Sequence, residues 1–123
     1  MSMCWETPPN VLVGILHTDN TSIAWSFGLR NLIIPGYIAP LPVCGVPFDM
    51  GRNIICQHAI NAGADAVFFL DSDVIPPRDA ILRLLAHRQP IVSGMYCRRS
   101  PPWSVPVAQK DYQWVTNFSP GEV

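Results

Sequence analysis

Charged side chains are scarce in this sequence of 123 residues. Only 14% of the residues are charged, the formal net charge is −1, and Lys110 is the one lysine. The arginines are scattered, except for the neighbours Arg98 and Arg99. A surface that binds nucleic acid needs a stripe of basic side chains to pair with the phosphates, so we expect no nucleic-acid partner.

The sequence also lacks the patterns of membrane, secreted and zinc-binding proteins. No apolar run approaches the roughly 20 residues of a membrane span. The opening stretch, MSMCWETPPN, does not have the basic and then apolar regions of a signal peptide. The four cysteines form no C-x-x-C pair, and three lie in or beside apolar segments, where we expect them reduced and buried. These absences predict a cytoplasmic protein with no membrane span.

What the sequence does have is enough apolar material for one core, interrupted by prolines. Apolar residues make up 49% of the chain, and the 13 prolines cluster near positions 8–9, 35–47, 76–77 and 101–106. Prolines in clusters mark connections between helices and strands rather than disorder. At this length we expect a single domain over residues 1-123.

Apolar patterns along the chain predict strands and helices in alternation. The expected strands are residues 11–16, 41–44, 66–70 and 91–96, and the expected helices are residues 23–32, 49–62 and 78–87. The prolines around the segment 41–44 indicate an edge strand, and the run 66–70 indicates a buried one. Such alternation favours an α/β fold, a three-layer α/β/α sandwich with a mostly parallel sheet.

Several residues are expected at the helix ends. We expect Asn20 or Thr21 to cap the first helix and Asp49 to cap the second. Gly63 is expected to end the second helix in a left-handed conformation, and Pro77 to open the third. The residues expected on the buried face of the second helix are Met50, Ile54, Ile55, Ala59 and Ala62.

Two aspartates follow the apolar run Ala66 to Leu70, with only Ser72 between them. Alternate residues of a strand share one face, so Asp71 and Asp73 are predicted to approach a single cation. In an open α/β sheet, the carboxyl edge of the strands is where ligands bind. Two carboxylates repel each other and suit a hard ion such as Mg²⁺ or Mn²⁺, which takes its other ligands from water and phosphates.

The stretch from Asp49 to Pro106 resembles the nucleotide-sugar-binding half of glycosyltransferases with the A-type fold. Within these it is most similar to the family-2-like and mannan-polymerase-like enzymes. The likeness covers about residues 10 to 108. It is carried by Arg52-Asn53, Ala64-Asp65, Leu70-Asp71-Ser72-Asp73, Val74, Pro76-Pro77 and Ile91 to Gly94.

The resemblance implies a Rossmann-like sheet of the nucleotide-diphospho-sugar transferase type. It implies that Asp73 holds Mn²⁺ or Mg²⁺ on the diphosphate of a UDP- or GDP-sugar donor. Asp71 would lie near the ribose or the waters of the metal ion, and Arg52 would reach toward the donor. The residues implied to border the nucleoside are His17, Thr18 and Asp19.

Enzymes of this type normally continue into a second half that carries the acceptor site and the general base. The resemblance implies that this acceptor-side half is missing, so we expect a truncated fold, and no catalytic residue or acceptor is assigned. Apolar surface that the missing half would cover predicts a homo-oligomer.

Other interpretations of the two aspartates remain open. The run F-F-L-D-S-D-V also fits the first motif of haloacid-dehalogenase-like phosphatases, in which Asp71 would be the nucleophile and Asp73 the acid and base. That family places the motif on its first strand and needs a downstream lysine and an acidic pair. Here the motif falls on about the third expected strand, Lys110 is the only lysine, and no paired acids follow. A further alternative is a non-catalytic domain that binds a nucleotide or only assembles with itself.

Overall fold

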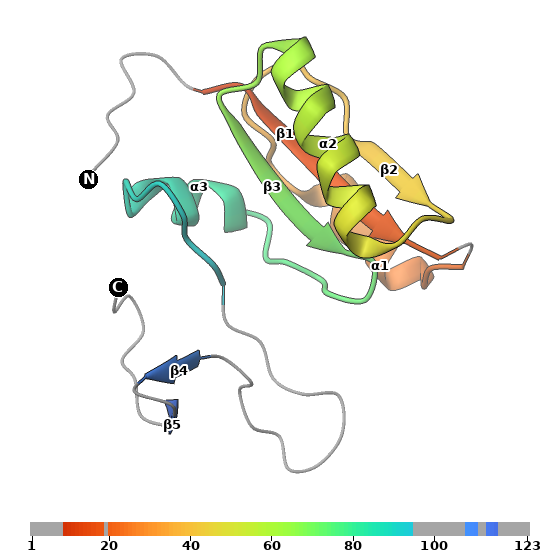
Figure 1. The fold of residues 1–123 in the computed structure, drawn as a ribbon. Helices are drawn as coiled ribbons and strands as arrows, with labels where there is room; N and C mark the ends of the chain where they lie inside the picture. The colour runs from red at the N-terminus through yellow and green to blue at the C-terminus, as the bar shows by residue number, and fades with distance from the viewer. Residues whose placement is uncertain (1–8, 19, 95–107, 111–112, 116–123) are drawn as a thin grey trace.

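The computed structural model describes residues 9–18, 20–94, 108–110 and 113–115. The elements follow in the order β1 (Val11–His17), α1 (Ile23–Asn31), β2 (Leu41–Cys44), α2 (Phe48–Ala62), β3 (Ala66–Asp71), α3 (Ala80–Ala86), β4 (Ala108–Lys110) and β5 (Gln113–Val115) (Figure 1). None of the described helices is long and apolar enough to cross a bilayer.

The main sheet has three parallel strands in the order β2-β1-β3 (Figure 1). β1 lies in the middle, and its residues 11–16 are all buried, because it has a strand on either side and helices above and below. β4 and β5 form a separate antiparallel pair. The expected α/β class with a mostly parallel sheet is confirmed in this coarse form, as a small open sheet with helices.

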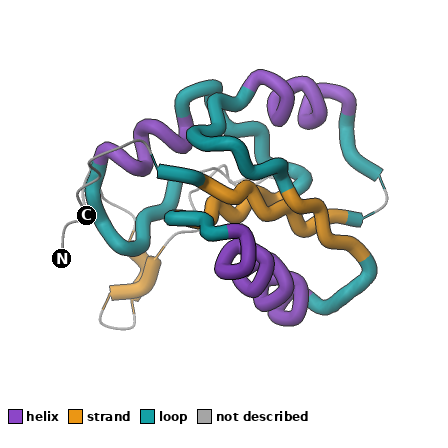
Figure 2. Tube along the Cα trace, turned by 90° about the horizontal axis from the view of Figure 1, so that it is seen from above, coloured by secondary structure: helices purple, strands orange, loops and turns teal. Residues whose placement is uncertain are grey.

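Helices cover both faces of this sheet, as Figure 2 shows from above. Alternate residues of β1 point to opposite faces and so enter two different cores. On one face Val11, Val13 and Ile15 join Trp25 of α1 and Ile81 of α3. The residues of the core on the other face are Leu12, Leu16, Ile55 and Ala59, the last two from α2.

α2 lies unusually close to β1 because two glycines face the contact. A Cβ atom on Gly14 of β1 would lie 2.5 Å from Cγ2 of Ile55, and one on Gly51 of α2 would overlap the side chain of Leu16. Ile55 is fully buried, so it has no room to move aside. Because Gly51 packs on Leu16, the N-terminal end of α2 lies beside the carboxyl end of β1.

The helix ends differ in part from the expectations. Ser22, rather than Asn20 or Thr21, caps α1, since its hydroxyl accepts a hydrogen bond of 3.0 Å from the backbone N–H of Trp25. α2 begins after Pro47 without a side-chain cap, and Asp49 lies inside its first turn, where a negative charge favours the helix dipole. Gly63 is left-handed, with φ of 71°, as expected.

α3 begins at Ala80, later than the expected start at residue 78. Pro77 does not open the helix, because its carbonyl accepts from the N–H of Ala80 in a preceding turn. The buried face of α2 is also narrower than expected. Gly51, Ile55 and Ala59 are buried at intervals of four residues. The other expected members, Met50, Ile54 and Ala62, are exposed.

β3 is the edge of the described sheet and is less buried than its apolar sequence predicts. Only Leu70 of its six residues is fully buried. The strand expected over residues 91–96 does not form at positions 91–94, so it covers no outer edge there, and residues 95–96 lie outside the described part. Cys44 and Cys56 are exposed, so the expectation of buried cysteines is wrong for these two.

Candidate functional site

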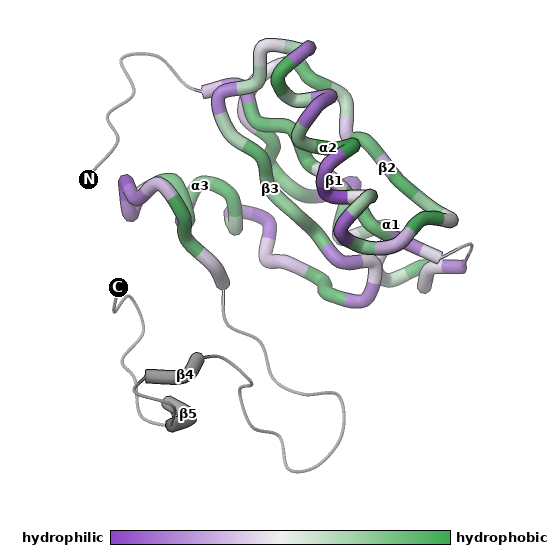
Figure 3. Tube along the Cα trace, in the orientation of Figure 1, coloured by the Kyte–Doolittle hydropathy of each residue, from purple (hydrophilic) through white to green (hydrophobic). Residues whose placement is uncertain are grey.

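The carboxyl ends of β1 and β3 meet at one edge of the sheet. The parallel register places Leu16 beside Asp71, the last residue of β3. His17 and Thr18, which follow Leu16 at the end of β1, therefore lie at the same edge as Asp71. In Figure 3 the strands are hydrophobic along most of their length, and the chain turns hydrophilic at the carboxyl end of β3. The predicted meeting of polar residues at this edge is therefore present in the structure.

A cleft of ≈ 510 Å³ opens at this edge. It gathers the predicted site residues His17, Thr18, Arg52, Asp71 and Asp73. The other lining residues are Leu16, Asn20, Thr21, Ser22, Trp25, Phe48, Ser72 and Ile75. Asp19, which was also predicted, lies outside the described residues. Segments from three parts of the sequence thus build one concave polar surface.

The two aspartates reach the cleft in different ways. β3 ends at Asp71, and Asp73 lies in the following turn, where the N–H of Val74 donates to the carbonyl of Asp71 at 3.2 Å. The strand alternation used to place them on one face is therefore wrong for Asp73. Both side chains are nevertheless exposed and line the same cleft.

Trp25 fixes the position of this turn. Its indole Nε1 donates a 3.0 Å hydrogen bond to the backbone carbonyl of Asp71, and its side chain is only 5% exposed. The backbone N–H of the same residue bonds to Ser22, so the start of α1 and the end of β3 are linked through one side chain. Asp71 is therefore held from the backbone while its carboxylate stays exposed.

Replacing Trp25 by Phe should loosen this link. The ring would still fill most of the space, but the Asp71 carbonyl would lose its partner, at a cost of about 1–3 kcal/mol in the free energy of unfolding. Urea denaturation followed by far-UV circular dichroism measures this cost. Phe27→Ala serves as the control, since Phe27 is 63% exposed on the same helix, and a Trp25→Phe protein no less stable than that control would contradict the role of Trp25.

His17 lines the cleft, and one of its ring nitrogens is hydrogen-bonded to the backbone. Its Nδ1 lies 2.6 Å from the backbone carbonyl of Thr18. A carbonyl oxygen only accepts, so Nδ1 carries the hydrogen and donates it. In the neutral ring the lone pair is then on Nε2, which suits it to accept a hydrogen bond from a ligand hydroxyl.

Arg52 supplies the positive charge of the cleft. It is exposed on α2, one turn after Phe48, and its guanidinium carbon lies 6.0 Å from the centre of the Phe48 ring. This is within the range of a cation–π contact, which steadies the long side chain without neutralising its charge. Among the described residues that line the cleft, the charged groups are Arg52, Asp71 and Asp73, which sum to +1 − 2 = −1.

The donor set of the cleft fits a hard divalent ion that keeps part of its water shell. Asp71 and Asp73 offer carboxylate oxygens, and Thr18 and Ser72 add hydroxyl groups nearby. Within the described ranges no group of three or more His, Cys, Asp or Glu side chains could hold a metal ion. These oxygen donors are of the kind that Mg²⁺ and Mn²⁺ take, and binding of such an ion at Asp71 and Asp73 stays a prediction.

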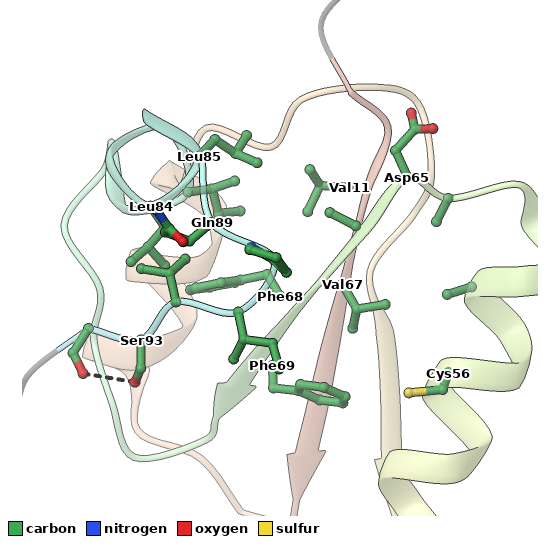
Figure 4. A pocket seen from close by; sticks show the side chains of 18 of the residues that line it. Val11, Cys56, Asp65, Val67, Phe68, Phe69, Leu84, Leu85, Gln89 and Ser93 are labelled. Atoms are coloured by element: carbon green, nitrogen blue, oxygen red, sulfur yellow. Dashed lines mark hydrogen bonds between the residues drawn. The ribbon is translucent and has the colours of Figure 1, made fainter. Parts of the chain in front are cut away.

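A larger hollow of ≈ 750 Å³ lies elsewhere, along the outer side of β3 (Figure 4). Its walls are mostly apolar, with Phe68, Phe69 and Leu84 among the side chains shown. Asp65 at its rim has a structural role, because its carboxylate accepts from the backbone N–H of Asn10 at 2.8 Å. None of the predicted site residues lines this hollow, whereas five of them line the smaller cleft, so the smaller cleft is the better candidate site.

No family model, curated protein or solved structure matches this chain. Function must therefore be inferred from the cleft itself.

Trp25 and Phe48 are cleft residues that the sequence did not reveal. Ser22, three residues before Trp25, gives a capping signal that could have located the start of α1. No local pattern marks Phe48, which follows Pro47 in a proline-rich stretch. Its place at the cleft depends on where α2 packs against β1.

Proposed function

We propose that this cleft binds a nucleoside-diphosphate sugar together with Mg²⁺ or Mn²⁺, as the donor site of a glycosyltransferase with the A-type fold. The observation that carries the proposal is the gathering of Asp71, Asp73, Arg52 and His17 at the carboxyl edge of a parallel sheet. Ligands of open α/β folds bind at that edge. The cleft also combines two carboxylates, which can bind a metal ion, with the guanidinium of Arg52, which can bind a phosphate group.

The charge of the cleft makes metal dependence a physical requirement of the proposal. The described lining residues sum to −1, so an anionic diphosphate alone would be repelled. A divalent cation between Asp71 and Asp73 would change the sum to +1 and give the diphosphate an attractive partner. Arg52 of α2 adds a second positive group to the cleft.

The reaction proposed is the transfer of the sugar to an acceptor hydroxyl. The bond between the sugar carbon and the diphosphate oxygen breaks, a bond from that carbon to the acceptor oxygen forms, and the proton of the acceptor hydroxyl passes to solvent. Negative charge develops on the leaving nucleoside diphosphate. A bound metal ion stabilises such charge electrostatically. Arg52 would stabilise it further from a fixed position, while His17 and Thr18 would border the nucleoside. We assign no general base to the described residues.

Calorimetric titration with UDP and with GDP tests donor binding. In the presence of Mn²⁺ we expect saturable binding of one of the two nucleotides with a stoichiometry of one. After chelation of the metal ion with EDTA, the affinity should fall at least about tenfold, which is about 1.4 kcal/mol of binding free energy. Binding that is equally strong without metal, or no binding of either nucleotide, would contradict the proposal.

The phosphatase interpretation gains no support from the fold. The D-S-D motif begins at the last residue of β3, the third of the described strands, whereas phosphatases of that kind carry it on the first. The homo-oligomer and the cytoplasmic location stay predictions.

A further inference from the structure

We infer that Phe48 is the surface on which the nucleobase of the donor stacks, an inference that rests on the proposed nucleotide-binding function. Phe48 is the first residue of α2 and lines the cleft beside Arg52. Its side chain is 69% exposed, although burial of a phenylalanine ring is favourable. A planar ligand that covered the ring would recover that free energy.

The contact with Arg52 supports a base on this ring rather than a phosphate. The guanidinium carbon of Arg52 lies over the Phe48 ring, 6.0 Å from its centre. The remaining ring surface is open to solvent, as the high exposure shows. One helical turn, about 5.4 Å along the axis, separates the two residues. The same helix thus offers an aromatic surface and a cation in sequence, which matches the base and the diphosphate of one nucleotide.

Among the described residues that line the cleft, no other large aromatic side chain has a ring available for stacking. Trp25 is only 5% exposed, and its indole nitrogen is bonded to the carbonyl of Asp71. Any base has a flat π-face, so stacking on phenylalanine tolerates both uracil and guanine. The ring would therefore raise the affinity for nucleotides above the affinity for phosphates without a base. The choice between bases would depend on hydrogen bonds to other residues.

The test compares ligands with and without a base, each titrated calorimetrically with Mn²⁺ present. The probes are UDP, GDP and inorganic pyrophosphate, and the proteins are the unchanged chain, Phe48→Ala, Phe48→Trp and Phe27→Ala. For Phe48→Ala we expect about tenfold weaker binding of the preferred nucleotide, a loss typical of one stacking contact. Its affinity for pyrophosphate should not change. Phe48→Trp should bind the nucleotide at least as tightly as the unchanged chain.

Phe27→Ala is the matched control, because Phe27 is an exposed phenylalanine of α1 that does not line the cleft. It should leave all affinities unchanged. Phe48→Trp also keeps the test usable if the alanine variant does not fold.

Three results would overturn the inference. Unchanged nucleotide affinity in Phe48→Ala would do so, and donor binding by the unchanged chain would still stand. An equal loss of nucleotide and pyrophosphate affinity would show that Phe48 only holds Arg52 in place. If the unchanged chain bound neither nucleotide nor pyrophosphate with Mn²⁺, the proposed function itself would fail, and the stacking role would fail with it.

Discussion

The Asp73→Asn protein is expected to lose about a hundredfold in Mn²⁺-dependent affinity for its nucleotide. The reason is electrostatic, since the substitution leaves Asp71 as the only carboxylate among the described residues of the cleft and brings the charge sum of those residues to zero. Losing even a supporting contact to a bound metal ion costs on the order of 10–100-fold, so losing a direct ligand should reach the upper end. Asparagine has nearly the same size, and Asp73 lies in an exposed turn, so the fold should persist. Calorimetric titration with Mn²⁺ and UDP or GDP measures the change.

Asp79→Asn is the matched control for this substitution. Asp79 is an aspartate away from the cleft, and its carboxylate pairs with Arg83 at 2.9 Å on the surface of α3. Exposed pairs of this kind contribute about 0–1 kcal/mol, so the control should fold and bind nucleotide normally. Unchanged affinity in Asp73→Asn, or an equal loss in both variants, would show that Asp73 is not a metal ligand.

Ile55→Ala should be the most damaging substitution to stability among the residues of α2. Ile55 is 0% exposed and fills the space over Gly14, in the contact between β1 and α2. Removing its side chain leaves a cavity that the backbone cannot close, at a cost of about 2–5 kcal/mol. A domain of ordinary stability has only about 5–15 kcal/mol in total. Urea denaturation should show a large fall in the midpoint concentration.

Ile60→Ala is the matched control, because it makes the same isoleucine-to-alanine substitution at an exposed position. Ile60 lies on the same helix but is 73% exposed, so its loss should alter the free energy of unfolding by about 0.5 kcal/mol or less. Similar losses in the two variants would mean that α2 does not pack on β1 through Ile55.

Local patterns in the sequence were sufficient to predict most of the sheet and its helices. The run 11–16, the segment 41–44 with its prolines, and the run before Asp71 all form strands, and Gly63 ends α2 in the left-handed conformation that glycine adopts easily. The grouping of His17, Thr18 and Asp71 followed from a general property of parallel sheets, that their carboxyl ends share an edge.

Features that depend on contacts between distant residues were missed. Trp25 and Asp71 are 46 residues apart, and no local pattern predicts a hydrogen bond between an indole and that carbonyl. Ile54 is exposed and Ile55 is buried, because the side of α2 that carries Gly51 is the side that can pack closely against β1. β3 was expected to be buried, but its burial depends on a neighbour that residues 91–94 do not provide.

The most direct measurement of the proposed site is paramagnetic broadening of backbone amide signals by Mn²⁺ in the presence of UDP or GDP. A site at Asp71 and Asp73 predicts strong broadening at His17, Thr18, Arg52 and Ser72, which line the cleft. The amides of residues 60–62 should be far less affected, because the far end of α2 lies about 15 Å along the helix axis from Arg52. Broadening centred on another part of the chain, or none at all, would contradict metal and nucleotide binding in this cleft.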